Sequence, residues 1–176
     1  MGVRVAGGID ARRAPKAQWD AGTAPMKLDA ADRKILRLLQ ENGRITNQEM
    51  ALQCNLSPSA CHERFKRLKD DGYIVGFSAI LNAEKLRRNF VVFAQVQLRA
   101  NGADQTQAFA DAVSRFQEVA EVYQITGPHD FLLRIQVADM QAYKTFLGQL
   151  MQLPAVLDVR SLPVLDRIKH DPNLPV

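Results

Sequence analysis

Residues 45–72 have the sequence ITNQEMALQCNLSPSACHERFKRLKDDG, and this stretch decides the fold of the first half of the chain. It contains two helix starts close together. Thr46 and Glu49 have the spacing of a capping box, in which each side chain bonds the other residue's backbone N–H. Further on, Ser57 can cap a second helix, and Pro58 then takes the first helical position, where proline is favoured. Two helices this close, joined by a short turn, predict a helix-turn-helix.

A third helix precedes this pair. Asp29 can cap it, Asn42-Gly43 can end it, and its apolar stripe consists of Ile35, Leu36, Leu38 and Leu39. Asn55, in the turn of the motif, belongs to a residue type that tolerates the left-handed conformation. We therefore expect a winged-type helix-turn-helix of three helices over residues 26–76. A β-rich segment, 73–81, predicts a strand leaving this unit, so residues 77–89 are interpreted as a strand and linker.

The second half alternates between strand and helix patterns. The predicted order is strand, helix, strand, strand, helix, strand, which is the ferredoxin-like βαββαβ arrangement. The predicted elements are strand 90–98, helix 104–116, strands 119–126 and 131–137, a helix from Met140 to Leu150, and strand 156–165. The fold class is therefore α+β, with the βαββαβ domain over residues 90–170.

Composition and charge limit the kinds of function that this protein can have. The net charge is +4, and the whole excess lies in residues 1–76, which suggests a polyanionic partner for the first half. Residues 1–25 have no apolar period and are expected to form a disordered basic tail. No apolar run approaches the ~20 residues of a membrane helix and no secretory signal is present, so we expect a cytoplasmic protein. Cys54 and Cys61 lack partners at metal-binding spacing, and no catalytic motif or cofactor motif appears.

The second helix of a helix-turn-helix places its N-terminal part in the major groove of DNA. On the predicted helix, hydroxyl, imidazole and basic side chains share the exposed side and its flanks, where they can contact bases and phosphates. An alternative is an ordinary solvated helix with a Glu63–Arg67 ion pair, but the surrounding caps and turn favour DNA binding. The candidate DNA-binding residues are Ser57, Ser59, His62, Glu63, Arg64, Lys66 and Arg67.

Several ordered motifs resemble the Lrp/AsnC family of transcription regulators, and together they extend from Met26 to about Lys169. They are Leu28–Leu39, Asn42–Asn47, Leu56–Leu68, Gly72–Ile74, Thr126–Leu133, Asp139–Tyr143 and Leu153–Val156. The resemblance implies a DNA-binding regulator that works with the nucleoid. It also implies a homodimer built on the βαββαβ domain, with dimers assembling into octamers.

The resemblance further implies a small-molecule effector, an amino acid or related metabolite, bound near the turn Gly127–Asp130. Gly127 lets the backbone approach a carboxylate, and Asp130 can accept from an ammonium group. From the residues alone this turn is a plain hairpin turn, and His129 is interpreted as solvated. Pro163 departs from the family pattern, since it removes a hydrogen-bond donor from the last strand. The candidate effector residues are Gln124, Thr126, Gly127, Asp130, Met140 and Tyr143.

Three other functions are compatible with parts of the sequence. An architectural DNA-compacting protein without an effector fits the first half, although Gly127 and Asp130 argue mildly against it. Some proteins similar to this family decarboxylate sirohaem, but the second half has only His129 and His170 as histidines and shows no catalytic triad, phosphate loop or metal cluster. A redox sensor would use Cys54 and Cys61, which fall on the predicted buried side of the helix-turn-helix, where thiols tend to be inert.

Overall fold

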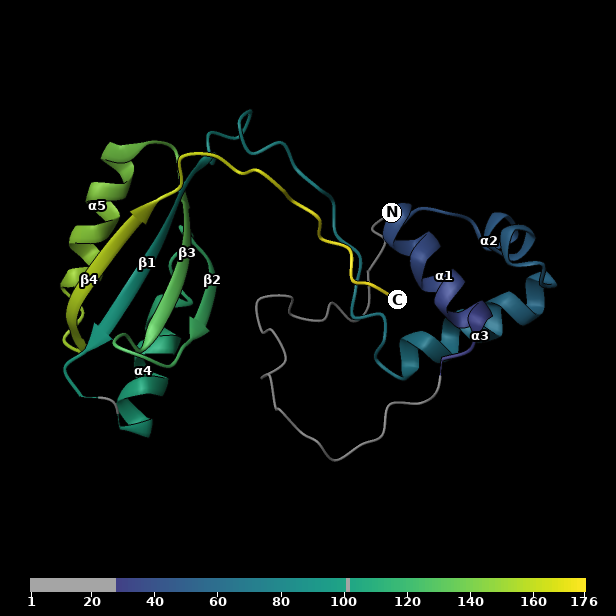
Figure 1. Ribbon diagram of the computed structural model, residues 1–176, viewed down its shortest axis with the longest axis horizontal. Coiled ribbons are helices and arrows are strands. Elements are labelled where there is room, and N and C mark those ends of the chain that lie inside the picture. The colour runs from purple at the N-terminus through teal and green to yellow at the C-terminus, as the bar shows by residue number, and fades with distance from the viewer. Residues whose placement is uncertain (1–27, 101) are drawn as a thin grey trace, which may run out of the picture. The chain divides into compact units, whose positions relative to one another are not determined.

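The computed structural model describes residues 28–100 and 102–176 (Figure 1). The described residues divide into two compact units. The first comprises residues 28–79 together with 171–176, and the second comprises residues 80–170. Three helices in the first unit and a βαββαβ order in the second confirm the α+β fold class. The prediction made for residues 1–25 lies outside the described residues.

The first unit contains α1 (Ala30–Glu41), α2 (Asn47–Cys54) and α3 (Pro58–Asp70). Each helix begins at the residue predicted to cap it. The Asp29 side chain accepts from the N–H of Asp32, Thr46 from Glu49, and Ser57 from Ala60. Asn55 ends α2 with φ 55° and ψ 44°, the left-handed conformation expected of it. These local signals fix the helix boundaries before any long-range contact is made.

One apolar core joins the three helices. Its buried members are Ile35, Leu36, Met50, Ala51, Cys61 and Leu68. A segment from the other end of the chain belongs to the same unit and was not predicted. The side-chain amide of Gln40 accepts from the N–H of Leu174 at 2.6 Å and donates to its carbonyl at 3.0 Å, as a neighbouring strand would. Val176 is partly buried against the core of the helices.

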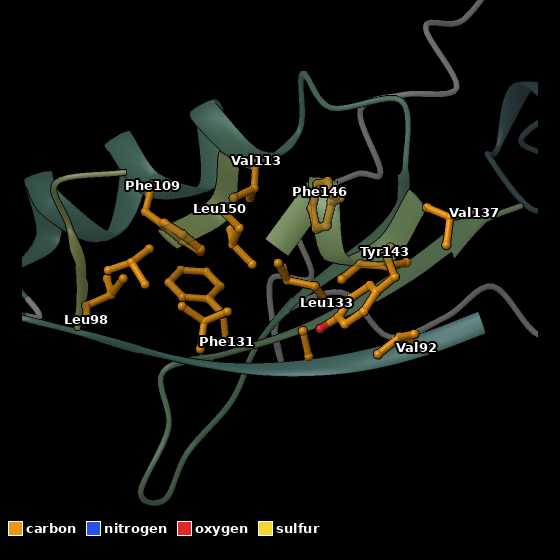
Figure 2. Close-up of a cluster of buried hydrophobic side chains, with 14 residues drawn as sticks. Val92, Leu98, Phe109, Val113, Phe131, Leu133, Val137, Tyr143, Phe146 and Leu150 are labelled. Atoms are coloured by element: carbon orange, nitrogen blue, oxygen red, sulfur yellow. The ribbon is translucent and has the colours of Figure 1, made fainter. Parts of the chain in front are cut away.

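The second unit is a four-stranded antiparallel sheet in the order β2-β3-β1-β4. The strands are β1 (Phe90–Leu98), β2 (Val119–Gln124), β3 (Phe131–Val137) and β4 (Val156–Pro163), and the helices are α4 (Ala103–Val113) and α5 (Met140–Met151). Alternate residues of β1 and β3 are buried in one core with residues of both helices, so α4 and α5 cover the same face of the sheet (Figure 2). Among residues 80–100 and 102–170, no helix or strand covers the opposite face.

The predicted strand over residues 73–81 is wrong, because residues 73–89 form no strand. Its β-rich sequence has no neighbouring strand to pair with, and an unpaired extended segment lacks the ladder bonds that define a strand. Three other predicted elements end earlier than expected. The helix from 104 stops at Val113, the strand from 119 at Gln124 and the last strand at Pro163. Pro163 still pairs with Val92, at the end of the ladder where a missing donor costs least.

Candidate DNA-binding helix and effector turn

The exposed face of α3 carries four of the predicted DNA-binding residues. Ser59, His62, Glu63 and Lys66 are exposed, and their spacing places them on one side of the helix. The side chains of His62, Glu63 and Lys66 make no hydrogen bond or ion pair within residues 28–100 and 102–176. The Ser59 hydroxyl lies 3.1 Å from that of Ser57. This face is therefore free to meet an external partner.

Arg64 and Arg67 are engaged within the fold. Nη1 of Arg64 lies 2.6 Å from Oδ2 of Asp29 and 2.9 Å from Oδ1 of Asp32. Nη2 of Arg67 donates to both carboxylate oxygens of Asp32 at 2.7 Å. The two arginines thus bind α3 to the start of α1. The alternative Glu63–Arg67 pair is not formed, because Arg67 is paired with Asp32 instead.

Asp32 is the centre of this cluster, and it is 2% exposed. A buried carboxylate is tolerated only when charged or polar donors surround it, and here two guanidinium groups do so. A backbone hydrogen bond from Asp32 and the guanidinium of Arg64 lower the pKa of Asp29. Hydrogen bonds to Asp29 and Asp32 raise the pKa of Arg64. The sequence carried a signal for this cluster, because Asp32 lies three and four positions before the buried Ile35 and Leu36 and therefore on the same helix face.

The two thiols of the DNA-binding unit are free cysteines that resist ionisation. Burial raises the pKa of Cys61, which is fully buried, and of Cys54, which is partly buried. A thiol with a raised pKa holds little of the reactive thiolate form at neutral pH. This environment argues against the redox-sensor alternative.

The turn between β2 and β3 contains the predicted effector residues Gly127 and Asp130. Ile125 donates to the Asp130 carbonyl at 2.9 Å, and the Asp130 N–H donates to the Val96 carbonyl at 2.9 Å. Oδ2 of Asp130 accepts from the N–H of Leu98 at 2.7 Å, which holds the turn against the end of β1. The carboxylate therefore has a structural bond as well as one oxygen without a partner among the described residues.

Several backbone N–H groups of this turn are unpaired. The N–H groups of Thr126, Gly127 and His129 have no hydrogen-bond partner within the described ranges. Gly127 has φ +118°, a conformation that side-chain-bearing residues rarely adopt, and apart from its chain neighbours no residue has an atom within 4 Å of where a Cβ would be. Unpaired N–H groups beside an exposed glycine can bind a carboxylate.

Met140 and Tyr143 do not lie at this turn. In the register of the sheet Val96 pairs with Phe131, next to the turn, whereas Phe90 pairs with Val137 at the other end. Met140 follows that far end, so the sheet separates it from the turn by roughly 20 Å at ~3.3 Å per residue. Figure 2 shows Tyr143 inside the core, where it is 3% exposed and its hydroxyl lies 2.5 Å from that of Ser161. Burial raises the pKa of Tyr143, in keeping with a core position.

Gln124 and Thr126 are exposed beside the turn, and Thr126 lies beyond the end of β2 rather than on the strand. Within one chain the structure therefore brings together four of the six predicted effector residues. The hydrogen bond from the Leu98 N–H to the Asp130 carboxylate was not predicted from the sequence, because nothing local to residue 130 indicates the register of β1.

Comparisons with known proteins support the prediction made for each half of the chain. Residues 28–75 match a winged helix-turn-helix DNA-binding domain, and residues 91–174 match the Lrp/AsnC ligand binding domain. The chain is 38% identical over 148 residues to the leucine-responsive regulatory protein of Escherichia coli K12, covering 84% of this chain and 90% of that protein. The chain belongs to the Lrp/AsnC family.

Solved structures of Lrp/AsnC proteins have the same fold. A transcriptional regulator from Neisseria meningitidis, in complex with L-methionine, is 38% identical with a TM-score of 0.80, over 85% of this chain and 97% of that one. An AsnC family regulator from Agrobacterium tumefaciens is 32% identical with a TM-score of 0.80, over 84% and 97%. The chain is accordingly a DNA-binding transcription regulator with a ligand-binding domain, from a family of regulators and not of enzymes. Within residues 28–100 and 102–176 no helix is long and apolar enough to cross a membrane.

Proposed function

We propose that the exposed face of α3 reads double-stranded DNA and that an amino acid or related metabolite, bound at the turn of residues 124–130, controls this binding. The proposal that α3 binds DNA rests on which polar side chains of this helix are paired within the fold and which are not. Arg64 and Arg67 are paired with Asp29 and Asp32, whereas His62, Glu63 and Lys66 are exposed and have no partner within the described residues. We therefore assign base and phosphate contacts to Ser59, His62, Glu63 and Lys66, with Ser57 as the helix cap beside them.

The test of the DNA interface separates a phosphate contact from a structural residue. Lys66→Ala is expected to weaken binding to all DNA sequences, and to make the slope of log Kobs against log salt concentration less negative by about 0.9, the loss of one phosphate contact. His62→Ala is expected to change sequence preference instead. Lys144→Ala, an exposed lysine of α5, is the matched control for loss of one positive charge. An unchanged salt slope for Lys66→Ala would place α3 outside the interface.

The effector part rests on the chemistry of the turn. A free amino acid carries a carboxylate and an ammonium group, so its site needs donors and an acceptor. The unpaired N–H groups of Thr126, Gly127 and His129 can serve the carboxylate, and the free oxygen of Asp130 can serve the ammonium group. The regulator from Neisseria meningitidis, with which this chain shares 38% identity, was solved with L-methionine, which makes an amino acid the first ligand to try.

Asp130→Asn tests the effector site with little disturbance of the fold. The amide oxygen of asparagine can still accept from Leu98, so the turn is retained while the negative charge is lost. We expect the fold and DNA binding to persist, and effector affinity measured by calorimetry to fall about ten-fold, for a loss of ~1–3 kcal/mol. The effector itself is found first, by a thermal-stability screen against the twenty amino acids. Unchanged affinity in Asp130→Asn would move the ligand elsewhere, and residues 161–164 would be examined next.

The uncovered face of the sheet supports a homodimer, with octamers assembled from dimers. Phe93, Tyr123, Leu132 and Leu162 lie on that face, on four neighbouring strands. An apolar surface on a sheet is a frequent protein interface. We expect Phe93→Arg to lower the mass measured by light scattering, and a monomeric parent protein would exclude the assembly.

A DNA-binding regulator of this kind acts in the cytoplasm on the nucleoid. The architectural alternative predicts that no metabolite changes DNA affinity.

A further inference from the structure

The segment 82–88, just before β1, makes one helical turn that ends in a Schellman motif. The N–H of Arg88 donates to the Ala83 carbonyl at 2.7 Å, and the N–H of Arg87 donates to the Glu84 carbonyl at 2.9 Å. This pair of bonds requires a left-handed residue at the position of Arg87, which has φ +52°. The motif is complete without any contribution from the Arg87 side chain.

Arginine is an unfavourable residue for that position. Left-handed backbone brings Cβ close to the following carbonyl, so glycine usually occupies it. Among the described residues the other non-glycine residue with positive φ is Asn55, whose type tolerates this conformation. Glycine would suit the backbone of the motif better, so the backbone conformation does not explain the arginine at this position.

The Arg87 guanidinium has no partner in the described part of the chain. No hydrogen bond or ion pair of the Arg87 side chain is present there. The neighbouring Arg88 makes a single long bond, 3.4 Å from Nη1 to the Gln136 carbonyl. A guanidinium group has five N–H donors, so nearly all donors of the two side chains remain available.

The two arginines line a cavity of about 400 Å³ that is widely open to solvent, and its size is typical of small-molecule sites. Its wall is made by apolar and small residues and by one acid. The lining residues are Leu86, Arg87, Arg88, Glu118, Val137, Ala138 and Ala142. Two positive charges against one negative charge give the cavity a positive balance, and Leu86 and Ala142 give it an apolar side.

We propose that this cavity binds a small organic carboxylate with a short apolar chain. The planar guanidinium fork matches the two oxygens of a carboxylate, and Arg87 and Arg88 supply two such forks. Leu86 and Ala142 receive the apolar chain. Glu118 repels a second negative charge, so a monocarboxylate fits this site better than phosphate or a DNA backbone does. This site lies at the end of the sheet opposite the turn of residues 124–130, since Val137 ends β3 where Phe131 begins it.

Saturation-transfer NMR on the full chain can detect such a weak ligand, with butyrate as the probe. We expect butyrate to receive saturation, most strongly at its methyl group, and to be displaced poorly by inorganic phosphate. Acetate, which lacks the apolar chain, should bind several-fold more weakly. Equal binding of phosphate and butyrate, or no saturation of butyrate, would overturn the proposal.

Arg87→Gly is the decisive variant, because it removes the guanidinium and relieves the backbone together. The melting temperature should be unchanged or higher, by up to about 4 °C, while butyrate affinity falls about five-fold or more. Arg87→Lys should keep part of the affinity. Lys85→Gln removes a positive charge from the same segment but not from the cavity, so it should bind butyrate like the parent. Unchanged binding in Arg87→Gly, or an equal loss in Lys85→Gln, would refute the assignment, as would a loss of DNA affinity alone.

Discussion

Replacing Asp32 with asparagine tests whether the buried ion-pair cluster holds the DNA-binding helix in place. The Asp32 side chain is 4% exposed and accepts from Arg64 at 2.9 Å and from Arg67 at 2.7 Å. Asparagine has nearly the same shape, but it carries no charge and turns one acceptor into an N–H donor facing the guanidinium groups. The arginines then lose their shared counter-ion.

The size of the effect follows from how far each partner is exposed. Removing one partner of a fully buried ion pair costs about 3–5 kcal/mol. The side chains of Arg64 and Arg67 are 29% and 45% exposed, so water can solvate them once Asp32 is neutral. We therefore expect a loss of about 2 kcal/mol, below the fully buried range. In a domain of this size that lowers the melting temperature by about 8–16 °C.

Differential scanning calorimetry of the full chain at neutral pH can measure this change in the transition of the DNA-binding unit. Asp29→Asn is the matched control, because asparagine still caps α1 and the Asp29 side chain is 51% exposed. It should melt well above the Asp32→Asn variant. If the two variants melted within about 2 °C of each other, burial of Asp32 would not be what stabilises the contact between α1 and α3.

The remaining predictions concern acid, the C-terminal segment and residues 1–25. Hydrogen bonds from Thr46 lower the pKa of Glu49, and Asp29 is shifted in the same direction, so the unfolded chain binds more protons in acid. Stability measured by urea unfolding should therefore fall as the pH drops below about 4, and Glu49→Gln should reduce that fall. Gln40→Ala should abolish the protection of the Leu174 amide in hydrogen exchange, whereas Gln48→Ala, an exposed control on α2, should preserve it. Deleting residues 1–25 should leave the melting temperature unchanged, and a clear decrease would mean that they pack on the fold.

The sequence predicted well what depends on neighbouring residues. The three caps Asp29, Thr46 and Ser57 act within one helical turn, so their signals survive without knowledge of the fold. Strands β1 and β3 were predicted to the residue, because each alternates between buried and partly exposed positions along its length. The βαββαβ order follows from these elements and their spacing.

Contacts between residues far apart in the chain could not be predicted from the sequence. The pattern of α3 marks Arg64 and Arg67 as exposed cations, and only the packing of α1 beside α3 brings Asp29 and Asp32 to them. The same holds for Leu174, whose pairing with Gln40 joins residues 134 positions apart. The strand predicted over 73–81 failed for the converse reason, since β propensity cannot supply the partner that a strand requires.

The pairing of two arginines also bears on how the protein holds DNA. Once Arg64 and Arg67 are neutralised by Asp29 and Asp32, the cations left on α3 are Lys66 and Lys69. Each phosphate contact contributes a limited, salt-dependent share of the affinity, so a recognition helix with two free cations contributes little phosphate affinity by itself. Two such units carried by one dimer bind as a linked pair, because the first contact raises the effective concentration of the second. We therefore expect strong DNA binding to depend on the proposed dimer, and Phe93→Arg should weaken binding to a paired site far more than binding to a single half-site.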